Sequence, residues 1–253
     1  MRRSRVLEKM RADAMAISFK LNFSCAREAE FASMFGFDCI WSDSEHIAND
    51  WSVVEKQIWA AKTNDTDVMV RVSKGCYSDF IKPLEMDAAG IMVPHVMSGK
   101  ETENVVRMTR FHPLGRRPID GGNADGKFCT MPVKNYIKNA NSKRFVAVQI
   151  EDPEGLENID EIASVDGIDM LFFGPGDFSH GIGEAGNTDH PRVTEARKRV
   201  ADTALENGKF AGTVGTPANL DMLFDMGFRF VNVGGDVKAI GNLCRELAED
   251  LNL

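Results

Sequence analysis

The chain has 253 residues, of which 43% are apolar and 27% are charged, and its formal net charge is −8 at pH 7. This length suits one large α/β domain whose core needs no disulfide or structural metal. The acidic balance argues against nucleic-acid binding, and no apolar stretch approaches the roughly 18 residues of a membrane-spanning helix. The composition therefore predicts a globular protein with neither nucleic acid nor membrane as a partner.

The cysteines indicate a reducing compartment. Their number is odd, they form no C-x-x-C pair, and they are scattered over the chain as Cys25, Cys39, Cys76, Cys129 and Cys244. A disulfide framework or a zinc ribbon is not expected from such spacing, whereas reduced thiols in the cytoplasm are. The basic N-terminus runs into a mixed segment without a long apolar core, so it does not have the pattern of a secretory signal.

Short apolar runs alternate with amphipathic stretches, a rhythm typical of parallel β–α–β units. In chain order, the predicted strands cover residues 14–21, 37–41, 68–72, 90–94, 145–150, 170–174, 209–213 and 228–233. The predicted helices cover residues 27–34, 53–62, 79–86, 99–110, 156–162, 192–207, 217–226 and 237–251. Gly36, Gly208 and Gly227 each follow a predicted helix, where a terminating glycine belongs.

Eight strand–helix pairs over this length predict a closed (β/α)₈ TIM barrel, an α/β fold, in place of an open doubly wound sheet. We expect a single domain over residues 1–253. The longest irregular segment, residues 112–135, is rich in glycine and proline. A loop of this length in a compact domain is usually functional or disordered.

In such a barrel the chemistry lies on the loops that follow the C-terminal ends of the strands. The steps from His46 to Arg71, from Arg71 to His95 and from Glu151 to Asp177 each span about one strand–helix unit, roughly 25 residues. Equal steps along a barrel place side chains at a similar height on neighbouring strands. The spacing therefore predicts a rim that carries histidine, arginine and two carboxylates.

Glu151 and Asp177 form the candidate metal site. Two carboxylates without cysteine or histidine between them suit a hard cation such as Mg²⁺ or Mn²⁺, with water or substrate as further ligands. The alternative is that one of them only caps the next helix. The turn Gly174-Pro175-Gly176-Asp177 leaves backbone amides open to an anion, or is a plain turn.

Arg71 interrupts an apolar run, so we expect its guanidinium to point into the barrel mouth and to bind a carboxylate or a keto oxygen. The alternative is an ion pair with Glu151 or another acid of the rim. His46, close to Asp43 and Glu45, is the candidate acid–base catalyst, although a lone histidine is more often structural. No nucleotide-binding or serine-hydrolase motif competes with this interpretation. Lys20, near the end of the first predicted strand, is the one lysine placed where a Schiff base would form.

Five segments occur in an order that resembles the HpcH/HpaI aldolase family, which is related to citrate lyase β subunits. They are Ser42-Asp43-Ser44-Glu45-His46, Val70-Arg71, Gly90-Ile91-Met92-Val93-Pro94-His95-Val96, Val148-Gln149-Ile150-Glu151 and Phe173-Gly174-Pro175-Gly176-Asp177-Phe178-Ser179. The resemblance extends from about Ser18 to Asp236. It implies a class II aldolase that reversibly cleaves a 4-hydroxy-2-oxo acid to pyruvate and an aldehyde.

The resemblance also implies a set of binding roles. Glu151 and Asp177 would bind Mg²⁺, Mn²⁺ or Co²⁺, which pyruvate would chelate. The amides of Gly176 and Asp177 would hold the pyruvate carboxylate, with Gln149 nearby. Arg71 would stabilise the enolate oxygen.

Two further implications concern acid–base chemistry and assembly. His46 would act as the base, directly or through a water, with Glu85 as its acidic partner. A homo-oligomer, trimer or hexamer, would exchange the C-terminal helix, residues 237–251, between subunits.

Three departures from the family pattern leave the acceptor aldehyde open. Ser44 stands where many members have glycine, and Lys20 stands near a position that is often tryptophan, so the pocket wall is changed. The loop at residues 116–126 replaces a usual Arg-Gly loop, and we expect it to help select the acceptor. An oxaloacetate decarboxylase, a CoA-thioester lyase on the same barrel and a non-catalytic keto-acid-binding barrel are the alternatives.

Overall fold

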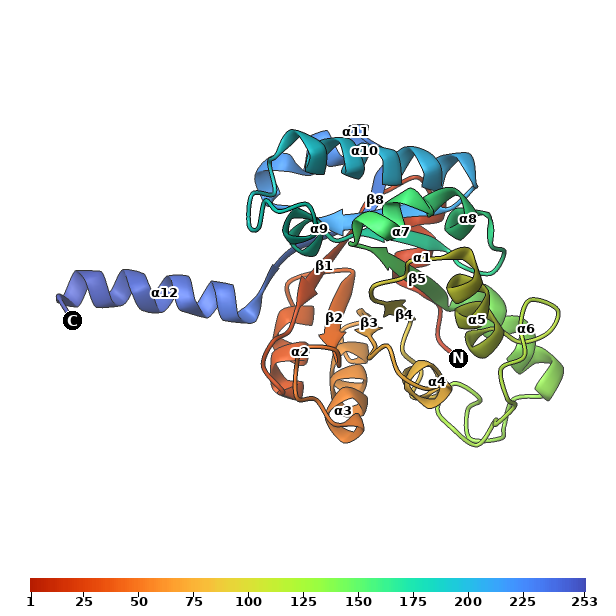
Figure 1. The fold of residues 1–253 in the computed structure, drawn as a ribbon. Helices are drawn as coiled ribbons and strands as arrows, with labels where there is room; N and C mark the ends of the chain where they lie inside the picture. The colour runs from red at the N-terminus through yellow and green to blue at the C-terminus, as the bar shows by residue number, and fades with distance from the viewer.

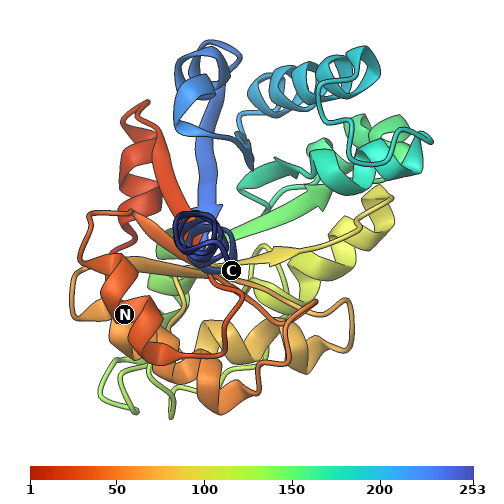
Figure 2. The ribbon, with the colours of Figure 1, turned by 90° about the vertical axis from the view of Figure 1, so that its left-hand side faces the viewer.

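The computed structural model describes residues 1–253 and has the predicted barrel at its centre. Eight parallel strands close on themselves in chain order, each paired with its two sequence neighbours. They are β1 (Ala16–Lys20), β2 (Cys39–Asp43), β3 (Asp67–Arg71), β4 (Gly90–Val93), β5 (Phe145–Ile150), β6 (Met170–Phe173), β7 (Phe210–Val214) and β8 (Phe228–Gly235). Figure 2 looks at the barrel from the end at which the C-terminal helix leaves it.

Helices surround the strands and connect them. They are α1 (Arg5–Arg11), α2 (Ala26–Ser33), α3 (Trp51–Lys62), α4 (Tyr77–Glu85), α5 (Gly99–Thr109), α6 (Val133–Lys143), α7 (Pro153–Glu157), α8 (Ile159–Ser164), α9 (Pro175–Gly181), α10 (Pro191–Glu206), the short 3₁₀ helix η1 (Pro217–Asn219), α11 (Leu220–Asp225) and α12 (Asp236–Leu251). The predicted helix at residues 156–162 is divided at Asn158, which separates α7 from α8.

The alternation of side chains along each strand divides the core into two parts. Trp41, Met69, Met92 and Phe172 belong to a buried cluster in the barrel interior, whereas alternate residues pack with the surrounding helices in a larger cluster. The same alternation directs Asp43, two residues after Trp41, toward the interior. In the register of β2 and β3, Asp43 pairs with Arg71.

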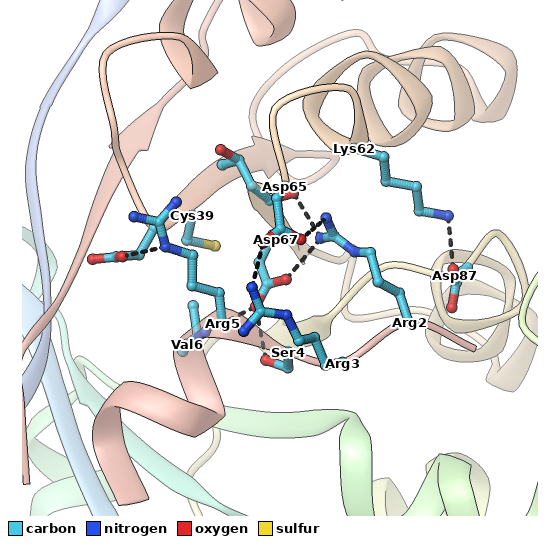
Figure 3. Close-up of polar contacts among 12 residues, drawn as sticks. Arg2, Arg3, Ser4, Arg5, Val6, Cys39, Lys62, Asp65, Asp67 and Asp87 are labelled. Atoms are coloured by element: carbon cyan, nitrogen blue, oxygen red, sulfur yellow. Dashed lines mark hydrogen bonds and ion pairs between the residues drawn. The ribbon is translucent and has the colours of Figure 1, made fainter. Parts of the chain in front are cut away.

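A short helix that the sequence analysis did not predict closes the N-terminal end of the barrel. Val6, Leu7 and Met10 of α1 are buried in the interior cluster. Asp67, the first residue of β3, accepts hydrogen bonds from the Val6 amide at 2.9 Å and the Ser4 hydroxyl at 2.7 Å. Arg2 also pairs with Asp67 at 2.8 Å, so the basic N-terminus is held against the acidic ends of the strands (Figure 3).

The C-terminal helix α12 projects away from the opposite end of the barrel (Figure 1). It begins directly after β8, at Asp236, whose carboxylate accepts hydrogen bonds from the amides of Asn22 and Phe23. Apart from Asp236, the helix has no buried residue.

The segment after α5 is irregular up to Pro132, and α6 begins at Val133, three residues inside the predicted loop. All five cysteines are free thiols. None of the helices combines the length and the apolar character that a membrane crossing needs.

Candidate active site

Glu151 lies directly after β5 at the barrel mouth and is 1% exposed. Its Oε1 accepts the backbone N–H of His95 at 3.0 Å, and its Oε2 accepts a hydrogen bond from the Gln149 amide group. Gly174 allows this close packing, because a Cβ there would lie 2.6 Å from Glu151 Oε2. The Oε1 atom of Gln149 is buried without a hydrogen-bond partner.

Asp177 reaches the same site from the first turn of α9, where it is exposed. Burial raises the pKa of Glu151 to about 7. The negative charge of Asp177 adds to this increase, whereas the positive charges of His95 and Arg71 oppose it. The two predicted metal-binding carboxylates and Arg71 are therefore close enough to influence one another. No cluster of three or more histidine, cysteine, aspartate or glutamate side chains with metal-binding geometry is present.

These residues fit a hard divalent cation. A cation of the Mg²⁺ class takes oxygen ligands and keeps several positions for water and substrate, so it does not need a third acidic ligand. The Oε1 atom of Gln149, beside the buried Glu151, has no hydrogen-bond donor in the protein. A water molecule bound to such a cation would supply that donor.

Arg71 is the last residue of β3 and is 4% exposed. Its Nε and Nη2 bind the two oxygens of Asp43 at 3.1 and 2.5 Å, and Nε lies 3.0 Å from Glu45 Oε2. The guanidinium also lies over the ring of Trp41, 5.1 Å from its centroid. Arg71 therefore pairs with Asp43, the last residue of β2, and with Glu45 just after it, which is the expected alternative of an ion pair with another acid of the rim; Glu151 is not a direct partner.

Asp43 holds the residues on this side of the mouth in place, although no role was predicted for it. It is fully buried, and its Oδ1 accepts the amides of Glu45 at 3.0 Å and His46 at 3.4 Å. Burial raises the pKa of Asp43, but the ion pairs with Arg71 and Lys20 outweigh it and lower the pKa to about 2. The available signal in the sequence was its position two residues after the predicted strand 37–41 and next to Glu45 and His46.

His46 and Glu85 are not brought together within one chain. The His46 side chain is 58% exposed at the mouth, and its Nε2 lies 3.5 Å from Glu45 Oε2. Glu85 ends α4, which runs back to the N-terminal end of the barrel, and its carbonyl accepts the Asp125 amide there. The predicted His46–Glu85 pair is thus absent from the single chain, because a helix antiparallel to the strands carries its last residue away from the mouth.

His95, a weaker candidate from the sequence, lies beside Glu151. Its Nδ1 is 2.8 Å from Asp152 Oδ2, and its Nε2 is 3.6 Å from Glu45 Oε1. Its backbone has a positive φ of +51°, which directs its N–H toward Glu151. Burial lowers the pKa of His95, but its pairs with Asp152 and Glu151 outweigh that effect and raise it.

Lys20 makes one wall of the mouth charged. Its Nζ lies 2.9 Å from Asp43 Oδ2 and 5.2 Å from the Trp41 centroid. It also lines a cavity of about 700 Å³ between the ends of β1, β7 and β8 and the start of α12. An ammonium group in an ion pair is not a free nucleophile, so this environment does not favour a Schiff base.

Comparisons with known proteins agree with the predicted resemblance. The family model for HpcH/HpaI aldolase/citrate lyase matches residues 21–242. A hydroxypyruvate/pyruvate aldolase of Roseobacter denitrificans is 32% identical over 87% of this chain and 86% of its own. A 5-keto-4-deoxy-D-glucarate aldolase of Shigella boydii is 30% identical over 87% of this chain and 85% of its own.

The crystal structure of an HpcH/HpaI aldolase from Desulfitobacterium hafniense superposes with a TM-score of 0.91, at 26% identity over 97% of this chain and 95% of that chain. The predicted fold class, and an enzyme of the carbon–carbon lyase class, are confirmed. Since the family model spans most of the sequence and two aldolases match at 30% identity or more, this chain belongs to the HpcH/HpaI aldolase/citrate lyase family.

Proposed function

We propose that this protein is a metal-dependent pyruvate aldolase, which reversibly cleaves a 4-hydroxy-2-oxo acid to pyruvate and an aldehyde. The observation that carries the proposal is the convergence of Glu151, Asp177 and Arg71 at the barrel mouth, where each of the other two affects the pKa of Glu151. The names of the aldolase relatives support the same reaction class.

Glu151 and Asp177 would hold a divalent cation, Mg²⁺, Mn²⁺ or Co²⁺. When bound, such a cation polarises the keto oxygen of the substrate and offsets the negative charge of the enolate. The amides of Gly176 and Asp177, in the first turn of α9, have no acceptor within their own helix and are assigned to the pyruvate carboxylate. Gln149, beside Glu151, is assigned to the same ligand.

The chain's own residues carry the remaining chemistry. In the cleavage direction a base removes the proton of the C4 hydroxyl, the C3–C4 bond breaks, and its electron pair forms the enolate of pyruvate. That enolate then takes a proton at C3. Arg71 is the group for the enolate oxygen, because Asp43 and Glu45 fix its Nε and Nη2 while Nη1 has no protein partner.

His46 is the proposed base, since it is accessible at the mouth. Its acidic partner within one chain is Glu45, 3.5 Å away, in place of Glu85. A carboxylate beside an imidazole stabilises the protonated form that the transfer creates. Glu85 keeps the predicted role only if a neighbouring subunit presents it.

We also propose a homo-oligomer in the cytoplasm, formed by residues 1–253 as one catalytic domain. An exposed apolar stripe along α12, consisting of Val237, Ile240, Leu243, Leu247 and Leu251, supports exchange of this helix between subunits. The five free cysteines fit a reducing compartment.

The test is release of pyruvate from 4-hydroxy-2-oxo acids by protein treated with EDTA and then supplied separately with Mg²⁺, Mn²⁺ or Co²⁺. We expect chelation to abolish the release and at least one cation to restore it, since no lysine in the mouth is free to replace the cation. Full activity after complete chelation would exclude this mechanism. Glu151→Gln should behave like the chelated enzyme, whereas Glu154→Gln, an exposed neighbour, should not.

A further inference from the structure

Arg197, on α10, is a buried guanidinium that no protein group satisfies. The residue is 7% exposed, its Nε is buried without a hydrogen-bond partner, and no ion pair of the structure includes it. Burial lowers the pKa of Arg197, as expected for a cation removed from water. A cation that is partly removed from water and has no protein partner is stabilised by a counter-group, and the buried Nε of Arg197 lacks one.

Arg197 lines a cavity of about 330 Å³ whose other lining residues are mainly polar. Thr188, Thr216 and Asn219 are among its lining residues, and Asn219 Oδ1 accepts the Thr216 N–H at 2.8 Å. The volume is about ten times the ~30 Å³ that one water molecule takes up in the liquid. The cavity can therefore hold a polar substituent larger than water.

This cavity adjoins the mouth of the barrel. Pro175, at its edge, is the first residue of α9, the helix that carries Asp177. Gly215 and Thr216 line both this cavity and the larger one that contains Lys20. The two cavities therefore lie on either side of a shared wall at the end of β7, next to the helix that carries Asp177.

Asp189 is the protein group that could serve as the counter-ion of Arg197. It lies on the wall of the cavity, and its charge opposes the effect of burial on the pKa of Arg197. Its side chain is exposed, however, and makes no ion pair with Arg197 within 4.0 Å. A carboxylate that remains in solvent leaves the planar fork of the guanidinium open to a ligand oxyanion, which it can bind through two hydrogen bonds.

We propose that Arg197, with Thr188 and Thr216, forms a subsite for the terminal oxyanion, a carboxylate or a phosphate, of the aldehyde acceptor. The assignment to the acceptor rests on the proposed aldolase function, whereas the anion site itself does not. The subsite would make this enzyme prefer acceptors that carry an acidic group at the end remote from the aldehyde carbon.

The first experiment follows thermal unfolding of the metal-free protein with inorganic phosphate or with chloride at equal ionic strength. We expect phosphate to raise the Tm of the wild type and of Arg199→Met, an exposed position on the same helix. Arg197→Met should lose this response, and Thr188→Val should reduce it. Equal stabilisation of Arg197→Met and wild type would overturn the site and indicate that Asp189 or water satisfies the guanidinium.

The second experiment compares kcat/KM for two aldehydes of equal length, one with a terminal carboxylate and one without. We expect Arg197→Met to lower the acid-to-neutral ratio at least about tenfold, the size of a charge-assisted hydrogen bond, and Arg199→Met to preserve it. An unchanged ratio together with a phosphate response that depends on Arg197 would mean that the site takes a free anion, which overturns the acceptor assignment.

A third measurement distinguishes failure of this proposal from failure of the aldolase assignment. Wild-type enzyme with metal should exchange the methyl protons of pyruvate for deuterium in D₂O without any aldehyde. Absence of exchange would count against the proposed function, while the phosphate comparison would still decide the anion site. If Arg197→Met does not fold, Arg197→Lys and Thr188→Val provide the same two comparisons.

Discussion

Arg71 is held in one orientation by acids that lie on a neighbouring strand. Asp43 is its partner in the β2–β3 register and binds two of its nitrogens, while Lys20 binds the same carboxylate from β1. A guanidinium fixed in this way needs no rearrangement when negative charge develops near it. Asp43 and Glu45 therefore hold the Arg71 side chain toward the mouth and leave its Nη1 for the substrate.

Replacement of Arg71 tests its role at the enolate. We expect Arg71→Ala to lower kcat by about 10²–10³, the cost of removing one donor to a developing oxyanion. Pyruvate proton exchange in D₂O should fall with it, because that step forms the same enolate. Arg107→Ala, an exposed arginine on α5, is the control. A near-normal exchange rate in Arg71→Ala would contradict the assignment.

The raised pKa of Glu151 predicts that metal binding depends on pH. In the metal-free protein, folding favours the neutral carboxylic acid of Glu151. This group therefore stabilises the folded state fully below its ordinary pKa of 4.5, and that stabilisation is lost as the pH rises through about 7. A cation binds the ionised form, so its affinity rises over the same interval. Mn²⁺ titration calorimetry should give about tenfold weaker binding at pH 6 than at pH 8. Equal affinity at both values would show that Glu151 is not the titrating ligand.

At the scale of single elements, α1 closes the N-terminal end of the barrel. Its apolar side chains enter the interior cluster beneath Met69 and Phe145, and Asp67 holds its first turn by hydrogen bonds to Ser4 and Val6. Asp67 is fully buried, and burial raises its pKa against these hydrogen bonds. This short helix therefore depends on tertiary contacts for its stability, since an isolated helix of seven residues is not stable in water.

Truncation of one side chain in α1 should destabilise the whole barrel. Leu7 is 2% exposed, so Leu7→Ala should lower the free energy of unfolding by about 3 kcal/mol through lost burial and a cavity. Arg11→Ala, on the outer side of the same helix, should change it by less than about 0.5 kcal/mol. Urea unfolding measures both, and equal midpoints would show that α1 does not close the core.

At the scale of the whole molecule, α12 is the element without a partner. It leaves the barrel as a free helix, and its exposed apolar side chains follow the spacing of one helix face (Figure 1). A soluble monomer rarely exposes such a stripe, whereas a subunit interface buries it. The same helix begins at the cavity that Lys20 lines, so the surface that we propose to bury between subunits borders that cavity.

A charge placed on this stripe should dissociate the oligomer. We expect Leu247→Glu to lower the molar mass measured by light scattering after size-exclusion chromatography, because a carboxylate in an apolar interface loses its hydration. Arg245→Glu introduces the same residue on the opposite face and should leave the assembly intact. A monomeric wild type, or an unchanged mass for Leu247→Glu, would exclude α12 as the interface.

The barrel itself was predictable from the sequence. Parallel strands covered on both sides appear as continuous apolar runs, so the predicted segment 68–72 and β3 (Asp67–Arg71) differ by one residue. Regular strand–helix units then place Arg71 at the end of β3 and Glu151 directly after β5, so the positions of these two residues followed from spacing. The sequence also carried the family resemblance that the comparisons confirmed.

Only the tertiary structure decided which groups meet. Arg71 pairs with Asp43 and Glu45, His95 joins Glu151 through its backbone, and Glu85 lies at the far end of the barrel from His46. Arg197 is one basic residue among several on α10 until folding buries it without a partner. Such contacts join residues far apart in the chain, and their energies depend on burial and orientation, which local sequence patterns do not determine.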